Sequence, residues 1–409
     1  MKISGKHLLV LVAMCGLLAS GVGLVTNVGG LFFTPVAEEF GVGKGAASLM
    51  ATICNIAFAF GGMFVPRILS EKTFRPLLVG ATATLAASTA ALCLCPGIMP
   101  MYALCVLRGV AAGLLGFVFV TTVLNNWFVA NIGLATSIAM GCSGIAGAAF
   151  SPVVSGAIGS AGWRGGFVLI GILTVVLNLP AILFLPSVDP KTKGLAPLGG
   201  SLEVGSQKSD KDNADKATPI NGLVFGAVLV YALLSSAATA LPQHFPGLAE
   251  TYALGAAAGA TMLSACMVAN TAGKILLGIL VDRIGTKISV LIYVVLVAVS
   301  LGLLLVVRGP IIIVVAAAMF GLCYALATVG ISMLTREAFG LENYGKTYPT
   351  ISLVGNIANA AFASVVGFMF DFSGGYTSTL IMFLAMMVAL VGIVLFVYAR
   401  RGVATAAAA

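Results

Sequence analysis

Twelve long apolar segments follow one another along this chain, and they constrain its fold more than any other feature. Each is about 20 residues or longer, which is the length that a helix needs to cross a hydrocarbon core about 30 Å thick. They are too long for the strands of a lipid-facing barrel, in which apolar and polar residues alternate. The predicted spans are 8–33, 46–67, 76–95, 99–122, 134–158, 166–186, 221–243, 255–280, 288–307, 309–333, 347–370 and 377–399. We therefore predict an all-α polytopic membrane protein with 12 transmembrane helices.

The scarcity of charge excludes several classes of protein. Charged residues make up 8% of the 409 residues, against about 25% in soluble proteins. So few polar groups cannot build the water-exposed surface of a soluble enzyme, and 60% hydrophobic residues exclude a disordered protein. The net charge of +8 is scattered between apolar runs, so the sequence contains no basic patch for nucleic acid.

Basic residues outside the spans predict the orientation. With the N-terminus in the cytoplasm, sixteen of the 21 Lys and Arg residues lie on the cytoplasmic side, in agreement with the positive-inside rule. These are Lys2, Lys6, Arg67, Lys72, Arg75, Lys191, Lys193, Lys208, Lys211, Lys216, Arg283, Lys287, Arg336, Lys346, Arg400 and Arg401. The first span continues to about Phe33, which is too long for a cleaved signal peptide. We expect a multi-pass protein of the cell membrane with both termini cytoplasmic.

One hydrophilic stretch divides the chain. Residues 187–219 contain five Lys, five Asp or Glu and several Gly, Ser and Pro residues, which is typical of a flexible linker. The predicted domains are an N-terminal six-helix bundle at 1–186, a cytoplasmic linker at 187–219 and a C-terminal six-helix bundle at 220–409. The eight cysteines lie within or at the ends of apolar runs, so we interpret them as core residues rather than disulfides or metal ligands.

The two halves repeat one another at an interval of about 212 residues. The matching segments are Phe33–Glu39 with Phe245–Glu250, Gly62–Arg67 with Gly278–Arg283, Arg108-Gly109 with Phe320-Gly321, and Ala161–Arg164 with Ser373–Tyr376. One six-helix unit was therefore duplicated, which predicts two pseudo-symmetric six-helix bundles. Chains built in this way hold a substrate near the bilayer midplane, where the repeats meet.

Two motifs connect the chain with a known superfamily. The loop after the eighth span reads Gly278-Ile-Leu-Val-Asp282-Arg283-Ile-Gly285-Thr-Lys287, and the fourth span contains Arg108-Gly109 followed by Gly113. In these motifs the chain resembles the major facilitator superfamily. The resemblance implies a gating role for the loop, in which Asp282 and the basic residues pair across helix ends and latch one state. The first-half copy departs from the pattern, because Pro66 stands where an Asp is expected.

Further segments indicate a group within that superfamily. They are Asn126-Trp127-Phe128, Gly133-Leu134-Ala135, Gly141, Gly144, Gly147, Pro152, Gly162-Trp163-Arg164 and Asn343-Tyr344-Gly345. Here the chain resembles the oxalate–formate antiporter and monocarboxylate porter group. Members of that group have a cation in the eighth span, and Lys274 stands at the matching position in place of the usual Arg. The second cation of dicarboxylate members is replaced by Ile351, and the first-span acid of proton-coupled members is absent.

Two ionisable side chains, Arg108 and Lys274, lie deep inside predicted spans, whereas all 13 acids lie in loops or at span ends. A charge at the bilayer centre costs roughly 2.5–3.5 kcal/mol on insertion scales, so two buried cations need partners. An anionic substrate would supply them. Two alternatives stay open, because Arg108 can bond helix ends or carbonyls and Lys274 can snorkel toward the cytoplasm.

Polar residues on the same helical faces complete the predicted substrate site. Asn270 lies one turn before Lys274, and Asn55 occupies nearly the same place in the second span. Asn356 and Asn359 share one face of the eleventh span. The predicted substrate-binding residues are therefore Lys274, Arg108, Asn270, Asn356, Asn359, Asn55 and Tyr324.

These features predict a secondary active, alternating-access transporter of a small organic anion, a monocarboxylate in our interpretation, moved by symport or exchange. The expected partners are that anion, a coupling proton or counter-anion, and the lipid bilayer; we expect a monomer without a cofactor or a nucleic-acid partner. One alternative is a proton-coupled drug or metabolite exporter, which is disfavoured because Ser151 rather than glycine precedes Pro152. A non-transporting membrane sensor is disfavoured by the short tail 402–409. An enzyme is not expected, because the sequence offers no catalytic triad or metal-ligand cluster.

Overall fold

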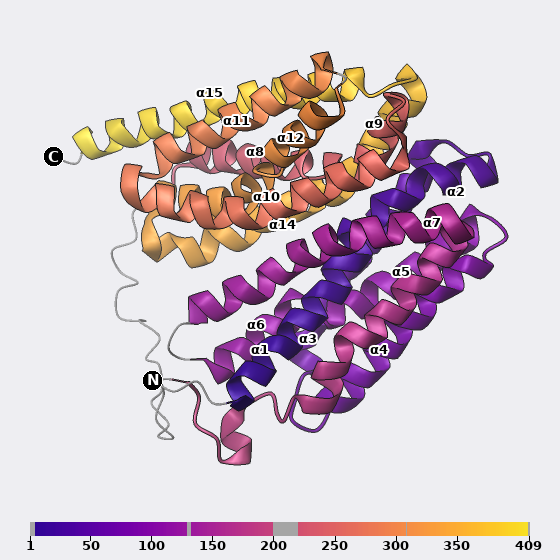
Figure 1. The fold of residues 1–409 in the computed structure, drawn as a ribbon. Helices are drawn as coiled ribbons and strands as arrows, with labels where there is room; N and C mark the ends of the chain where they lie inside the picture. Colours follow the sequence, from indigo (N-terminus) through magenta and orange to yellow (C-terminus); the bar gives the residue numbers. More distant parts are fainter. Residues whose placement is uncertain (1–4, 129–131, 199–219, 308, 408–409) are drawn as a thin grey trace. The chain divides into compact units, whose positions relative to one another are not determined.

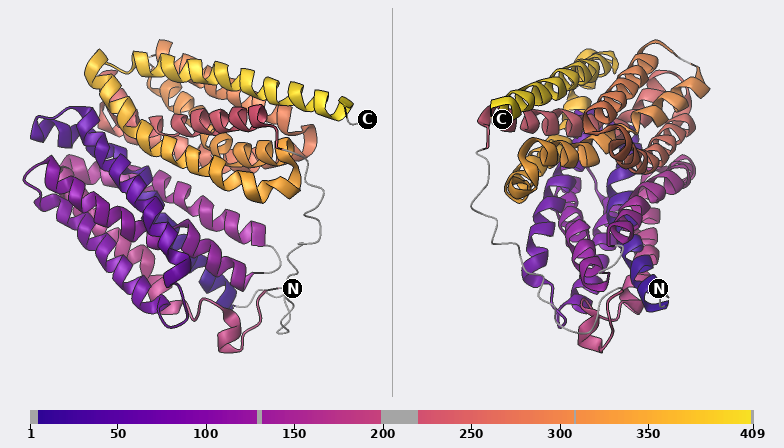
Figure 2. Two further views of the ribbon diagram at one scale, coloured as in Figure 1. Left: turned by 180° about the vertical axis from the view of Figure 1, so that it is seen from behind. Right: turned by 90° about the vertical axis from the view of Figure 1, so that its left-hand side faces the viewer.

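The computed structural model describes residues 5–128, 132–198, 220–307 and 309–407, and these segments are almost entirely helical (Figure 1). The chain divides into two compact units, Met1–Ser206 (unit 1) and Gln207–Ala409 (unit 2), which are described one at a time. Within each unit the long helices run side by side (Figure 1 and Figure 2).

Unit 1 begins with a span that is interrupted in its middle. Its elements are α1 (Gly5–Leu18), the π-helix η1 (Ala19–Asn27), the 3-10 turn η2 (Gly29–Phe32), α2 (Phe33–Phe40), α3 (Lys44–Ile68), α4 (Phe74–Ala91), η3 (Leu92–Leu94), α5 (Ile98–Leu114), α6 (Phe117–Trp127), α7 (Ile132–Phe184) and η4 (Pro190–Lys193). The wide π-turns of η1 and the tight turns of η2 replace regular helix over 19–32.

Unit 2 follows the same plan. Its elements are α8 (Gly222–Ala238), the 3-10 turn η6 (Leu241–His244), α9 (Phe245–Thr251), α10 (Gly255–Ile284), α11 (Thr286–Val306), α12 (Pro310–Phe320), α13 (Cys323–Ala325), the π-helix η7 (Leu326–Gly330), α14 (Ile331–Ser373) and α15 (Thr377–Ala407). Helix α9 begins at Phe245, and its equivalent in the sequence repeat, Phe33, is where α2 begins. The break in the first span of unit 1 therefore recurs at the matching place in unit 2.

The described residues contain eleven helical segments that are long and apolar enough to cross a membrane. One of them, Ala135–Phe184, has 50 residues and would be about 75 Å long at 1.5 Å per residue, more than twice the hydrocarbon core. It is interrupted at Gly162, whose φ of 69° is left-handed. This segment therefore holds the two spans predicted at 134–158 and 166–186, and the predicted fold with twelve spans is confirmed.

Glycines allow neighbouring helices to approach closely at equivalent places in the two units. A Cβ atom on Gly109 of α5 would lie 2.3 Å from the carbonyl oxygen of Cys54 in α3. A Cβ atom on Gly321, the equivalent glycine of unit 2, would lie 2.3 Å from the carbonyl oxygen of Cys266 in α10. Small residues are what allow helix backbones to come this close in a membrane. The sequence repeat is thus also a repeat of packing.

The chain that leaves α7 is fastened to unit 1. The indole Nε1 of Trp127 donates to the carbonyl of Ser187 at 3.1 Å, and the amide of Leu198 donates to the carbonyl of Trp127 at 2.9 Å. Further bonds to this segment are Asn126 Nδ2 to Val188 O, Arg75 Nη2 to Leu185 O, and Asp189 N to Glu71 Oε1. The first part of the predicted linker is therefore ordered; residues 199–219 lie outside the described part of the chain.

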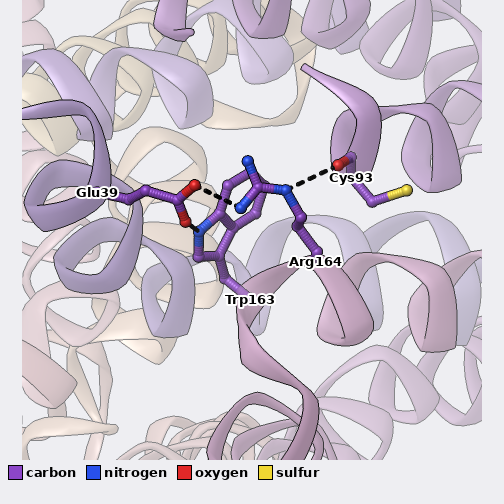
Figure 3. A network of polar contacts seen from close by, with 4 residues as sticks. All are labelled: Glu39, Cys93, Trp163 and Arg164. Atoms are coloured by element: carbon purple, nitrogen blue, oxygen red, sulfur yellow. Dashed lines mark hydrogen bonds and ion pairs between the residues drawn. The ribbon is translucent and has the colours of Figure 1, made fainter. Parts of the chain in front are cut away.

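The opposite end of unit 1 is tied together around Arg164 (Figure 3). Its guanidinium pairs with Glu39 of α2 and donates from Nε to the carbonyl of Cys93 at 3.1 Å. The same guanidinium lies over the indole of Trp163, whose Nε1 also donates to Glu39. Three stretches far apart in sequence, at α2, η3 and the Gly162 break of α7, therefore meet there.

Replacing Gly109 by Ala is expected to destabilise the protein by about 1–3 kcal/mol, because the new methyl group would overlap the backbone of α3. Gly80 is the matched control, since it is an exposed glycine in the middle of α4, and a Cβ atom added to it would have nothing within 4 Å. Gly80→Ala should not destabilise the protein, because alanine is favoured over glycine by about 0.5–1 kcal/mol inside an exposed helix. Thermal unfolding of the two variants in one detergent measures the difference, and equal transition temperatures would contradict the close approach.

Candidate functional site

A cavity opens inside unit 1 beside the broken stretch of the first span. Its volume, in the sense in which cavity volumes are usually given, is about 20 Å³, room for about one water molecule. The lining residues are Val25, Thr26, Gly29, Phe32, Phe33, Met50, Ala51, Cys54, Asn55, Arg108 and Phe167. Irregular backbone at membrane depth is tolerated where it is buried in protein or lines a cavity, and π-helical turns often occur at functional sites. The helix break and the cavity therefore belong to one feature.

Arg108 of α5 is the charged residue of this cavity. Its side chain is only 5% exposed. Nη2 donates to the carbonyl of Val25 in η1 at 3.3 Å, and the guanidinium carbon lies 5.9 Å from the ring centre of Phe167. Nε is buried and has no hydrogen-bond partner in the described part of the chain. Arg108 thus supports the broken helix with one nitrogen, while Nε is buried without a hydrogen bond.

Asn55 of α3 contributes a second donor to the cavity. The hydroxyl of Thr26 donates to its Oδ1 at 3.4 Å. Its Nδ2 is buried without a partner among the residues described. A buried donor without a partner is costly, roughly 1–3 kcal/mol for a neutral group and more for a charged one. Asn55 and Arg108, the residues that carry these two buried donors, both line the cavity.

The lining contains one cation and no carboxylate. Its remaining polar groups are the Thr26 hydroxyl, the Asn55 amide and the Cys54 thiol. The other lining residues are Gly29 and six apolar or aromatic side chains. A carboxylate accepts hydrogen bonds at two oxygens, and charge-assisted bonds from guanidinium are among the strong ones. The cavity is therefore suited to an anion and unsuited to a cation.

Lys274 and Asn270 lie one turn apart on α10 of unit 2. Lys274 is half-buried, and within the described residues its ammonium makes no hydrogen bond or ion pair. Asn270 is 5% exposed; its Nδ2 faces the sulfur of Met267 at 3.9 Å and its Oδ1 has no partner among the described residues. The Lys274 ammonium and the Asn270 Oδ1 atom therefore both lack a hydrogen-bond partner among the described residues.

Three of the other predicted positions have different surroundings. Tyr324 donates to the carbonyl of Thr239 at 3.2 Å, and Asn359 donates from Nδ2 to the Thr239 hydroxyl at 2.6 Å. Thr239 lies between α8 and η6, where the first span of unit 2 is interrupted. Asn356, in contrast, is exposed. Spacing on one helix face indicated Asn356 and Asn359 together, but only Asn359 reaches the break.

The loop motif lies at the junction of α10 and α11. Gly285 adopts a φ of 80°, which allows the sharp turn between the two helices. Asp282 and Arg283 are exposed, and Asp282 makes no ion pair within the described part of the chain. The ammonium of Lys287 lies 5.7 Å from the ring centre of Tyr398 in α15. Gly278 lies on the last turns of α10 with open space around its Cα.

Sequence reasoning missed Thr26 and Thr239. Each is a single threonine inside a predicted span, and the length and mean hydropathy of a span do not show that its helix is interrupted. The signal available was the repeat, since Thr239 occupies the position in unit 2 that matches Asn27 in unit 1. Nδ2 of Asn27 likewise bonds across its unit, to the carbonyl of Ser143 at 3.1 Å.

Asn359→Ala should lower the free energy of unfolding by about 0.5–1.5 kcal/mol, because it removes the hydrogen bond to Thr239. Asn356→Ala, on the same helix and exposed, should stay within about 0.5 kcal/mol of the parent. Thermal unfolding of the purified variants compares them. If Asn356→Ala is the more damaging change, the assignment of Asn359 to the helix break is wrong.

Comparison with known proteins was made on the sequence and on the fold. The model of the Major Facilitator Superfamily matches residues 9–246 and 223–408. No curated protein matches the sequence. Among solved structures, the crystal structure of a D-xylose-proton symporter matches with a TM-score of 0.69 over 96% of this chain and 97% of that chain; at 15% identity this likeness shows the fold alone. The chain belongs to the Major Facilitator Superfamily and is a secondary active transporter, not an enzyme.

Proposed function

We propose that this transporter moves a small organic anion, a monocarboxylate, by symport or exchange, as in the oxalate–formate antiporter and monocarboxylate porter group. The observation that carries the proposal is the cavity of unit 1, where Nε of Arg108 and Nδ2 of Asn55 are both buried donors without partners among the described residues. A carboxylate supplies acceptors for both.

Electrostatics favours an anion over a neutral substrate. A buried charge that lacks a partner is strongly unfavourable, and Arg108 is only 5% exposed in a cavity without a carboxylate. The Val25 carbonyl supplies one hydrogen bond at 3.3 Å but no opposite charge. An anion that binds there neutralises the guanidinium, and the filled cavity is easier to close than the empty one.

The single cation of the cavity favours one carboxylate rather than two. The position at which dicarboxylate members of the group have a second cation is occupied by Ile351, whose side chain is fully buried. In unit 2 we propose Lys274, with Asn270, as a second group that attracts an anion, since its charge lacks a partner among the described residues. The lining contains no carboxylate that could relay a proton, which disfavours a proton-coupled exporter.

Purified protein in liposomes should therefore take up or exchange labelled short carboxylates, tested as a panel of lactate, acetate, formate, oxalate and an aromatic acid. Arg108→Gln and Lys274→Gln should each lower kcat/KM at least about tenfold, the equivalent of 1.4 kcal/mol. Lys72→Gln, at an exposed position between α3 and α4, is the matched loss of charge and should keep the parent activity. Full activity of both Gln variants would contradict the proposed charge pairing, and a panel without any transported acid would overturn the proposed function.

We also propose that the chain lies in the cell membrane with both termini cytoplasmic, and that the loop motif of Gly278, Asp282, Arg283, Gly285 and Lys287 takes part in gating at that side. The excess of Lys and Arg in the segments that share this side supports the orientation. Gly285 forms the turn, and the side chains of Asp282 and Arg283 are exposed. They are therefore free to form ion pairs in one state of the transport cycle and to break them in another.

A cysteine placed at exposed Lys72 should react with a membrane-impermeant maleimide in inverted vesicles and resist it in right-side-out vesicles. A cysteine at Met99, which is 72% exposed at the other end of unit 1, should show the reverse pattern. Labelling of the parent chain, which has eight cysteines, is subtracted. The opposite result at both positions would invert the proposed orientation.

A further inference from the structure

The interrupted first span of unit 2 contains a buried histidine. His244 is the last residue of η6 and is only 2% exposed. One of its ring nitrogens, Nε2, lies 2.8 Å from the carbonyl oxygen of Ala363 in α14. Because a carbonyl only accepts hydrogen bonds, Nε2 carries the hydrogen of the neutral ring, and Nδ1 is the atom at which the ring can gain a proton. The imidazole therefore joins η6 to α14 and still has a basic nitrogen.

The sequence repeat shows that folding does not require this imidazole. Phe32 is the equivalent of His244, and Phe167 is the equivalent of Thr379. In unit 1 the two phenylalanine rings stack with their centres 3.9 Å apart. Unit 2 has polar side chains at both positions, and the hydroxyl of Thr379 is buried without a hydrogen-bond partner in the described part of the chain. An apolar pair in one unit is thus replaced by two polar residues in the other.

Two carboxylates act on the tyrosine that neighbours His244. The ring of Tyr376, the residue before α15, has its centre 6.0 Å from the ring centre of His244. Burial raises the pKa of the Tyr376 hydroxyl, and the carboxylates of Glu250 in α9 and Asp371 in α14 raise it further. Tyr376 therefore stays neutral, whereas Glu250 is half-buried and Asp371 is exposed.

These surroundings are suited to a proton. Histidine is the side chain that most readily gains and loses a proton near neutral pH, and carboxylates have the sign that favours a positive ring. Helix α10 also packs against η6, and its residues 255–273 contain no charged group and one thiol, that of Cys266. Asp371, Tyr376 and His244 thus form a series from an exposed acid to a buried imidazole.

We propose that His244 binds the coupling proton of the transport cycle, and that the chain therefore moves its anion by proton symport rather than by anion exchange. The inference rests on the proposed function and adds the coupling ion to it. The step is a protonation: Nδ1 of the neutral ring takes a proton, which gives an imidazolium, and later returns that proton to water. His244 lies in the interrupted stretch of its span, so a change in the winding of η6 would alter the contacts of the ring with Ala363 and Tyr376, and with them its affinity for the proton.

The test separates proton-driven uptake from exchange, in liposomes that contain the pH indicator pyranine. The probes are labelled lactate, acetate, formate, oxalate and an aromatic acid, and uptake into protein-free liposomes is subtracted, because undissociated weak acids cross lipid unaided. The parent should accumulate at least one of these acids when the outside is more acidic, and protons should enter with it. His244→Gln keeps an N–H group for the Ala363 carbonyl but cannot gain a proton near neutral pH. It should lower gradient-driven uptake at least about tenfold and leave exchange at equal pH within about twofold of the parent.

His7→Gln is the matched control, since it removes the other histidine of the chain, and it should keep both activities. Gradient-driven uptake that persists in His244→Gln, or parent uptake that does not respond to the proton gradient, overturns the inference and leaves the proposed function standing. A parent protein that moves none of the acids overturns the proposed function, and this inference with it.

A structural role of His244 would give a different result. Loss of exchange to the same extent as gradient-driven uptake would assign the imidazole to structure and overturn the inference. Where thermal unfolding shows that His244→Gln does not fold, His244→Phe takes its place, because phenylalanine is the residue of unit 1 at the equivalent position. If neither variant folds, the imidazole is needed for the fold and the inference is wrong.

Discussion

A helix that is interrupted inside a membrane must satisfy the backbone groups that the interruption frees, because lipid offers no water to do so. In unit 1 a guanidinium nitrogen of Arg108 reaches the Val25 carbonyl at 3.3 Å, and in unit 2 the hydroxyl of Tyr324 reaches the Thr239 carbonyl at 3.2 Å. Each donor comes from the fourth span of its half. In unit 1 the residue that supports the break, Arg108, also lines the cavity.

The duplicated plan makes the difference between the halves informative. Gly109 and Gly321 hold the same close approach to a neighbouring helix, so the frame around the two positions is shared. Arg108 nevertheless corresponds to Phe320, which is fully buried with its ring 5.9 Å from that of Phe245. One copy thus fills this position with an apolar ring, and the other places a charge there beside a cavity. Folding of the repeat does not require the charge, which supports its assignment to substrate.

Apolar runs predicted the fold because length and hydropathy are enough to identify a membrane helix. Length and hydropathy did not locate the breaks at 19–32 and 239–244, because both lie inside runs that are apolar enough to be spans; the local signals there are the glycines of 19–32 and Pro242. Helical spacing predicted that Asn359 and Asn356 share one face, but it could not predict what either side chain contacts. In the structure Asn359 donates a hydrogen bond to Thr239, whereas Asn356 is exposed. Likewise the hydrophilic composition of 187–219 predicted a flexible linker, whereas Trp127 and Asn126 bond to residues of its first part, 187–198. Of the two roles that its sequence position left open, the structure shows that Arg108 bonds a backbone carbonyl, and its contact with substrate is our proposal.

The bond between Arg108 and Val25 has a further consequence for kinetics. A guanidinium held by the backbone is already ordered when the substrate arrives, so little side-chain freedom is lost on binding. It is also unable to follow the substrate on its way out. Any change in the pitch of η1 moves the carbonyl of Val25 and, with it, the guanidinium to which we assign the proposed anion. The affinity for the proposed anion therefore depends on the winding of η1.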